Sequence, residues 1–257
     1  MAPTYPCFPG LRHSPFHPSE TCPGVAILQA QYPAIRAEAL ALSDTAQLDY
    51  TIASKPWRSW RDPRTWFARR AAPRAWTVYP FYHMGIDVEA ITQRCPRTMA
   101  IIQSLPGVCL DYPWGDAIFS VQGAQSRLPV HCSVDNLRLR CHLGIRIPDQ
   151  TGIRVDQETR TWTEGQALLF EDAFPHDGWN LSAERRIVLI VDFWHPDLTD
   201  IEIRALTAGF RHSAVRSIFI RKRISMTDSP APYVQHMQAA LEAQDQSPEI
   251  LEFWPAQ

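Results

Sequence analysis

The segment HCSVDNLRLRCHLG, residues 131–144, alternates polar and apolar residues and predicts a β-strand with one unusual face. Successive side chains of a strand point to opposite faces, so Arg140 and His142 share one face. Burying arginine or histidine costs free energy unless a partner satisfies it. The segment therefore raises the question of what lies opposite these side chains.

The region from about Asp116 to Trp194 has the pattern of short alternating strands separated by turn residues such as Pro148-Asp149-Gln150 and Glu164-Gly165. We expect strands at 117–123, 137–147, 151–159, 166–172 and 185–194. Strands of this length with tight connections predict an antiparallel sandwich or jelly roll.

Helices are expected on either side of these strands. The Ala- and Leu-rich segment 25–43 predicts a helix that Pro33 kinks or splits, and 87–105, 199–208 and 231–245 are further candidates. The whole chain, 1–257, is predicted to be a single mainly β domain with flanking helices. Residues 1–115 would hold helices and aromatic, arginine-rich loops, 116–198 the β core, and 199–257 a C-terminal extension.

Composition narrows the class of protein. The 257 residues are 45% hydrophobic and carry a net charge of −2, which gives no overall field for nucleic acid or anionic lipid. The longest apolar run, IVLIV at 187–191, is far shorter than a membrane span needs. No secretory signal is visible, and the six cysteines form no CxxC pair. We therefore expect reduced thiols, a cytoplasmic location, and neither nucleic-acid nor membrane partners.

The segment 54–76 interleaves four tryptophans with six arginines. Such a mixture can stack bases and hold phosphates. In a net acidic chain, the favoured interpretation is an irregular loop whose tryptophans pack inward while the arginines face water. A third reading is that this loop forms a wall of a substrate site.

Several polar residues lie where a β core should be apolar: Ser120, His131, Arg140, His142, His176 and Arg186. Each alone has an ordinary structural explanation. Together, two histidines on neighbouring sheet elements can bind one divalent iron through imidazole nitrogens. An arginine shortly after the second histidine supplies the planar fork that binds a carboxylate.

The order of several blocks resembles the aspartyl/asparaginyl β-hydroxylase family between about Gly24 and Leu206. The matching pieces are Trp76 with the aromatic run to Gly85, CPRT at 95–98, the strand around Ser120, HCSVDNLRLRCHLG, ETRTWTEGQALLFEDAFPHDGWN at 158–180, and RRIVLIVDFWHPDLT at 185–199. The resemblance implies a dioxygenase that uses iron(II), 2-oxoglutarate and O2, with a cupin-like double-stranded β-helix core.

Carried over position by position, the resemblance implies that His131 and His176 ligate iron. It implies that Arg186, with Ser120, holds the distal carboxylate of 2-oxoglutarate. Arg140 and His142 would contact the end that chelates the metal. The buried cations would then face a dianionic ligand and a metal rather than protein, and no catalytic residue is expected beyond the metal ligands.

The third metal position departs from the His-x-Asp…His pattern of many such enzymes. Ser133 stands where the carboxylate would be, and Asp135 is a poor substitute. Members of the family often leave this place to water. Iron halogenases also lack the carboxylate, so chlorination is a minority alternative.

The substrate is less defined. Trp76 and Arg138 fall where the family's substrate pocket lies, although Arg138 is equally well read as a surface residue. We expect hydroxylation of an unactivated C–H bond of a small acid or amino-acid-like molecule (a natural-product or peptidyl unit included), with a lipid less favoured. The competing class is a non-catalytic β-sandwich that binds an organic acid. The extension after about Thr207 could cap the site, form a homodimer or lie on the surface.

Overall fold

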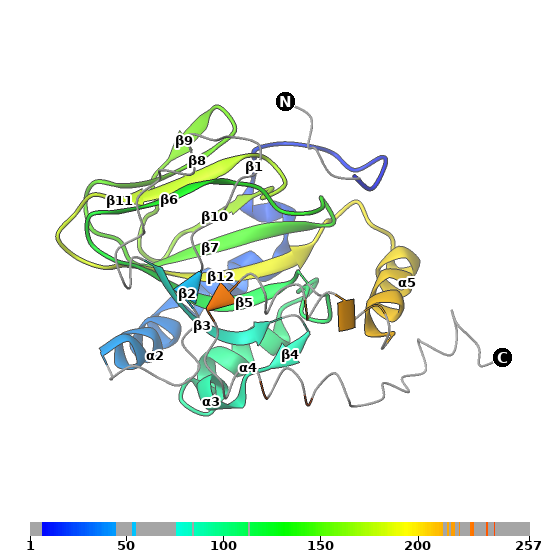
Figure 1. Ribbon diagram of the computed structural model, residues 1–257, viewed down its shortest axis with the longest axis horizontal. Coiled ribbons are helices and arrows are strands. Elements are labelled where there is room, and N and C mark those ends of the chain that lie inside the picture. Colours follow the sequence, from blue (N-terminus) through cyan, green and yellow to red (C-terminus); the bar gives the residue numbers. More distant parts are fainter. Residues whose placement is uncertain are drawn as a thin grey trace.

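The computed structural model describes residues 7–44, 53–54, 76–83, 85–112 and 114–212, with isolated positions beyond 212. Two antiparallel sheets face each other, with helices against the outer side of the larger one (Figure 1). The fold is the predicted one, mainly β with a jelly-roll core. None of the helices within the described residues is both long and apolar enough to cross a membrane.

The larger, seven-stranded sheet is called the major sheet. Its strands are, in order, β1 (Phe16–His17), β10 (Ala167–Phe170), β7 (Arg138–Arg146), β12 (Arg186–Trp194), β5 (Asp116–Gln122), β3 (Trp76–His83) and β4 (Ile86–Asp87). The four-stranded minor sheet has the order β6 (Ser126–His131), β11 (His176–Asn180), β8 (Thr151–Val155) and β9 (Glu158–Arg160). A small ladder joins β2 (Ala53–Ser54) to β13 (Thr227–Asp228).

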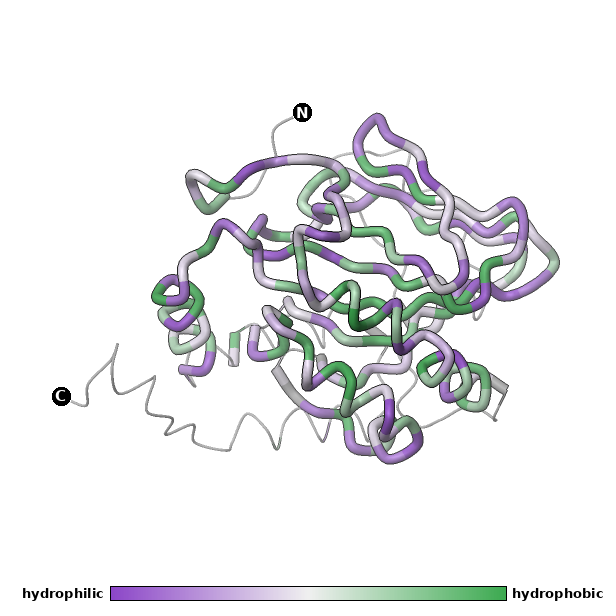
Figure 2. Tube along the Cα trace, turned by 180° about the vertical axis from the view of Figure 1, so that it is seen from behind, coloured by the Kyte–Doolittle hydropathy of each residue, from purple (hydrophilic) through white to green (hydrophobic). Residues whose placement is uncertain are grey.

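The two faces of β7 differ as the alternating sequence predicts. Its odd-numbered residues from Leu139 to Ile145 are fully buried and belong to one hydrophobic core with residues of the flanking helices. Figure 2 shows hydrophobic stretches along the central strands, whereas hydrophilic residues colour the outer turns. The even-numbered face of β7 is left to carry the polar residues.

The N-terminal helices follow the prolines. The expected helix at 25–43 is two helices, α1 (Pro23–Ala30) and α2 (Tyr32–Asp44), split just before Pro33 as predicted. The single helix expected at 87–105 is wrong. The chain forms α3 (Glu89–Thr92) and α4 (Pro96–Ser104), because Pro96 cannot continue a helix and Cys95 before it leaves the helical conformation.

The five predicted strands are present, and the one expected at 151–159 is the hairpin β8–β9, turning at Asp156 with a φ of 51°. The prediction missed the longer strands β3, β6 and β11, two of which end or begin at a candidate histidine. The segment 55–75 and most of the helix expected at 231–245 lie outside the described residues.

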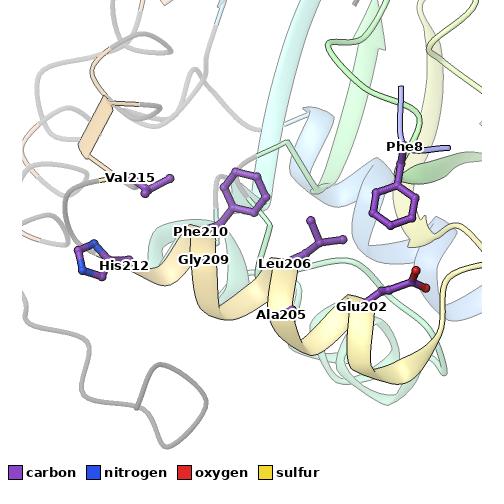
Figure 3. Close-up of a pocket in the computed structure, with 8 residues that line it drawn as sticks. All are labelled: Phe8, Glu202, Ala205, Leu206, Gly209, Phe210, His212 and Val215. Atoms are coloured by element: carbon purple, nitrogen blue, oxygen red, sulfur yellow. The ribbon is translucent and has the colours of Figure 1, made fainter. Parts of the chain in front are cut away.

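The helix expected at 199–208 is α5 (Asp200–Arg211), which begins with a capping box between Thr199 and Glu202. It packs on a second, smaller core that contains Tyr112 and Trp194. A cavity of about 640 Å³ opens along α5 (Figure 3). Its lining contains none of the predicted site residues; it is formed by Phe8, Glu202, Ala205, Leu206, Gly209, Phe210, His212 and Val215.

Candidate metal and cosubstrate site

The two candidate iron ligands lie side by side. His131 ends β6, His176 begins β11, and the two are direct cross-strand partners. Their imidazole centroids are 4.1 Å apart, with an angle of 53° between the ring planes. Residues 45 positions apart in the sequence therefore present their rings at one place.

The backbone fixes which nitrogen each ring presents. His131 Nδ1 lies 2.8 Å from the carbonyl oxygen of Pro129, and His176 Nδ1 lies 2.9 Å from that of Phe174. A carbonyl only accepts, so each Nδ1 carries the proton and each Nε2 keeps a bare lone pair. Metal-binding histidines are held in this way, with the second nitrogen donating to a carbonyl or carboxylate.

Burial favours the neutral form of both rings. Desolvation, followed by the proximity of His131, lowers the pKa of His176 to about 3. Desolvation also lowers the pKa of His131, against the opposing effect of its bond to Pro129. Both imidazoles are therefore neutral near pH 7, which is the form that binds a metal.

The other candidate residues share the even-numbered face of the major sheet. Strand register places Arg186 opposite Gln122, Val188 opposite Ser120, and Ile190 opposite His142. The Gln122 side chain contacts the carbonyls of Ser126 and Gly178, so this face looks toward the minor sheet that carries the two histidines. The register thus brings the predicted iron and 2-oxoglutarate residues to one interior.

Arg186 is a buried cation that has no anion beside it among the described residues. Its side chain is fully enclosed, and one nitrogen donates to Gln122 Oε1 at 3.0 Å, while Nε has no hydrogen-bond partner. No carboxylate of the described residues pairs with it, and burial lowers the pKa of its guanidinium to about 9. An enclosed guanidinium of this kind is stabilised by an anionic ligand.

His142 and Trp162 are unsatisfied in the same way. Both ring nitrogens of His142 and Nε1 of Trp162 are buried without hydrogen-bond partners in the described structure. The two rings stack at 18° with centroids 6.0 Å apart, and the Arg186 guanidinium lies 4.7 Å from the Trp162 ring centre. Buried polar atoms are normally paired, so several unpaired ones around one arginine indicate a ligand site.

One aromatic ring links the two halves of the site. The Phe170 ring lies 4.8 Å from His142 and 5.8 Å from His176, centroid to centroid. The two candidate metal ligands are thus connected to the guanidinium of Arg186 through the rings of Phe170, His142 and Trp162. Sequence reasoning missed Trp162 as a site residue, although it stands within the block ETRTWTEG that carried the family resemblance.

Ser120 and Trp76 are brought together on neighbouring strands. Trp76 Nε1 donates to Ser120 Oγ at 2.9 Å, and Ser120 is buried. Ser120 neighbours Val188 on β12, one inward-facing position from Arg186. Their expected roles toward 2-oxoglutarate and substrate remain predictions.

Arg140 does not face a free ligand site as the sequence reading expected. Its guanidinium makes two bonds to Asp192, at 2.8 and 2.7 Å, and further ion pairs with Asp116 and Asp172 at 3.2 Å each. The expectation that the buried cations face a ligand rather than protein is therefore wrong for Arg140. The contact of Arg140 with 2-oxoglutarate stays a prediction. The side chain that would make this contact is already bound by protein carboxylates.

Arg138 is also held by protein. It is only 2% exposed, so the reading as a surface residue is wrong. Its guanidinium lies on Asp135, Asp172 and Asp192 at 3.0–3.3 Å. The contact of Arg138 with a substrate carboxylate stays a prediction, and the guanidinium nitrogens that would make it already donate to these aspartates.

The similarity of this chain to known proteins agrees with the site. The model of the aspartyl/asparaginyl β-hydroxylase family matches residues 29–196, well over half of the chain. The chain belongs to this family. The family is one of hydroxylases, which indicates an enzyme.

Relatives of this β-hydroxylase family member include two curated proteins. It is 32% identical over 189 residues to an ornithine lipid ester-linked acyl 2-hydroxylase of Rhizobium tropici, covering 72% of this chain and 62% of that protein. It is 33% identical over 206 residues to aspartate beta-hydroxylase domain-containing protein 1 of Homo sapiens, covering 79% and 50%. The chain thus spans between half and about three fifths of these relatives' lengths.

Solved structures similar to this family member include cupin domains. One is the Cupin_2 domain of an XRE family transcriptional regulator from Enterobacter cloacae, 13% identical, with a TM-score of 0.32. The match covers 47% of this chain and 98% of that domain.

Among the described residues of this β-hydroxylase family member, no carboxylate joins His131 and His176 as a third ligand at the predicted metal site. Ser133 Oγ accepts from Arg138, and Asp135 accepts from the Tyr112 hydroxyl at 2.6 Å and from Arg138. Within the described residues, no three His, Cys, Asp or Glu side chains are grouped to hold a metal. The donor set is therefore two imidazoles, which suits a ferrous ion that also takes ligands from outside the protein.

Proposed function

We propose that this family member is an iron(II)- and 2-oxoglutarate-dependent dioxygenase that hydroxylates an unactivated C–H bond and releases succinate and CO2. The supporting observation is one juxtaposition. Two neutral imidazoles with free Nε2 lone pairs are linked, through the rings of Phe170, His142 and Trp162, to a buried guanidinium that has no carboxylate partner among the described residues. A pocket for an organic acid alone would not need the histidine pair.

Each residue has a defined task in this proposal. His131 and His176 would hold the ferrous ion, and Arg186 would bind the distal carboxylate of the keto acid. Trp162 would hold the guanidinium plane of Arg186 by stacking. His142, which stacks on Trp162, would offer its two unpaired ring nitrogens to the bound keto acid. When bound, the iron and the keto acid supply the oxidising power for the C–H bond, and the protein positions the substrate and excludes water.

Anaerobic titration tests the metal and cosubstrate together. Metal-free protein given iron(II) and 2-oxoglutarate should develop a weak visible charge-transfer band and, in air, release succinate. The His176→Ala protein should show no band, and the Arg186→Gln protein should need far more 2-oxoglutarate. No band in the wild type, or an unchanged band in His176→Ala, would overturn the assignment.

For the substrate, we propose a small acid or amino-acid-like molecule. A second candidate is the acyl chain of an amino-acid-containing lipid, favoured by the similarity to an ornithine lipid acyl 2-hydroxylase. Mass spectrometry of candidate substrates of both classes should reveal a gain of about 16 Da, one oxygen atom. A chloride-dependent gain of one chlorine would instead indicate halogenation.

A further inference from the structure

Arg138 is a buried cation whose guanidinium is surrounded by protein acceptors. It is the first residue of β7 and its side chain is 3% exposed. All three guanidinium nitrogens have acceptors: Nε lies 3.3 Å from Asp192, one terminal nitrogen 3.0 Å from Asp135, and the other 3.1 Å from Asp172. The last nitrogen also donates to Ser133 Oγ.

Three of these four acceptors, all except Asp192 of β12, belong to the two loops next to the candidate metal-binding histidines. Ser133 and Asp135 follow His131 by two and four residues, and Asp172 precedes His176 by four. The loops also touch directly, since the amide of Ser133 donates to the carbonyl oxygen of Asp172 at 2.7 Å. One guanidinium therefore bridges the segment after the first ligand and the segment before the second.

The backbone pairing of the minor sheet is irregular next to the two histidines. The pairing of β6 with β11 shifts register between His176 and Gly178, right beside the pair. The hydrogen bonds of each imidazole run to a carbonyl two residues earlier in its own segment, at Pro129 and Phe174. Those bonds orient each ring but do not connect one ring to the other.

The outer end of this bridge is fixed. The second oxygen of Asp135 accepts from the Tyr112 hydroxyl at 2.6 Å. The Tyr112 ring packs on Trp194 at 5.3 Å and on Phe210 of α5 at 4.7 Å between centroids. Asp135 is thereby anchored to the smaller core, so the loop after His131 cannot drift without disturbing that core.

We propose that Arg138 is a positioning residue that sets the spacing of the two metal-binding imidazoles by clamping the loops on which they sit. This rests on the proposed function, since it assumes that His131 and His176 hold a divalent metal. Arg138 would act through Ser133, Asp135 and Asp172, without touching the metal.

Cobalt(II) binding to the metal-free protein tests the clamp without any turnover. Cobalt gives a visible ligand-field spectrum that reports the ligand set, and its titration gives an affinity. Arg138→Gln should weaken cobalt binding by about 10- to 100-fold, the usual loss when a group that orients metal ligands is removed. It should also change the shape of the spectrum, which a general loss of stability would not do.

A milder variant covers the case in which Arg138→Gln does not fold. Ser133→Ala removes one contact of the clamp without leaving a buried charge unpaired, and should weaken cobalt binding by about threefold to tenfold. Arg154→Gln is the matched control. It removes an arginine–aspartate pair of 2.8 Å at Asp177, next to His176, but on a half-exposed side chain, and should bind cobalt like the wild type.

The outcomes separate the two proposals. Wild-type protein that binds no cobalt overturns the proposed metal site and the clamp with it. Wild-type protein that binds cobalt, together with folded Arg138 or Ser133 variants of unchanged affinity and spectrum, overturns the clamp alone. Weakened binding in these variants but not in Arg154→Gln supports it.

Discussion

At the scale of single residues, the inner face of the major sheet contains two arginines with opposite surroundings. Arg140 lies among aspartates, whereas Arg186 has none within the described residues. A buried cation with protein counter-ions stabilises the fold as part of a network, but one without them is poised for a ligand. The difference makes opposite predictions for the same substitution.

Arg140→Met should lower the free energy of unfolding by about 3–5 kcal/mol, because it removes one of the two guanidiniums that neutralise the buried carboxylates of Asp172 and Asp192. Arg186→Met should leave the metal-free protein within about 1 kcal/mol of the wild type, or more stable, since an unpaired buried charge is removed. Urea unfolding of both variants measures this. Equal losses would contradict the division between the two arginines.

The buried histidines predict how stability depends on pH. Burial lowers the pKa of His176 to about 3, whereas an unfolded histidine titrates near 6.5. Between these values the unfolded state binds more protons, so stability is complete above about pH 6.5 and is lost as the pH falls toward 3. The slope for one such group is about 1.4 kcal/mol per pH unit.

The free energy of unfolding of the metal-free protein, measured in chelator at several pH values between 7 and 4, should rise with pH, with this contribution from His176. His176→Gln should show a shallower slope, because its side chain does not titrate. A variant with the wild-type slope would mean that His176 is not held neutral in the folded protein.

At the scale of elements, one glycine allows the Trp162 loop to cross close to β7. Gly144 exchanges backbone hydrogen bonds with Gly165 and Gln166. A Cβ on Gly144 would lie 2.4 Å from the carbonyl oxygen of Thr163. Only glycine allows this approach, which sets the loop against the inner face of the sheet.

Gly144→Ala should therefore destabilise the protein by about 2–3 kcal/mol, in the range of mutations that force backbone apart. It should also weaken 2-oxoglutarate binding, because Trp162 and its loop must shift. Gly178→Ala on β11 is the control, since its Cβ would meet only Gly152 at an ordinary 3.7 Å. Thermal unfolding and ligand titration compare the two; similar effects would refute the role given to Gly144.

At the scale of the whole molecule, the site lies between two sheets that meet only in the folded state. The histidines come from the minor sheet, and Arg186 and His142 come from the major sheet. Ligands that bind across the two sheets should stabilise the native state alone, by mass action.

Manganese(II) and 2-oxoglutarate, when each is present at about 100 times its dissociation constant, should each add about 2.7 kcal/mol to the free energy of unfolding. Together they should raise the melting temperature by about 10–20 °C. Manganese serves because it does not turn over. His131→Ala should lose the metal contribution, and succinate, which lacks the keto group and is one carbon shorter, should replace 2-oxoglutarate poorly. A melting temperature that neither ligand changes would contradict the assignment of this site.

The sequence by itself predicted strands β5, β7, β10 and β12, the hairpin β8–β9, the split near Pro33 and the family, because these depend on local periodicity and on motifs. It did not reveal strands β6 and β11, whose sequences SRLPVH and HDGWN contain proline or glycine and follow no clear alternation. Nor did it indicate which cations are paired. The aspartates around Arg138 and Arg140 come from separate strands and loops, so only the tertiary structure, through strand register, decided that these two arginines have carboxylate partners while Arg186 has none among the described residues.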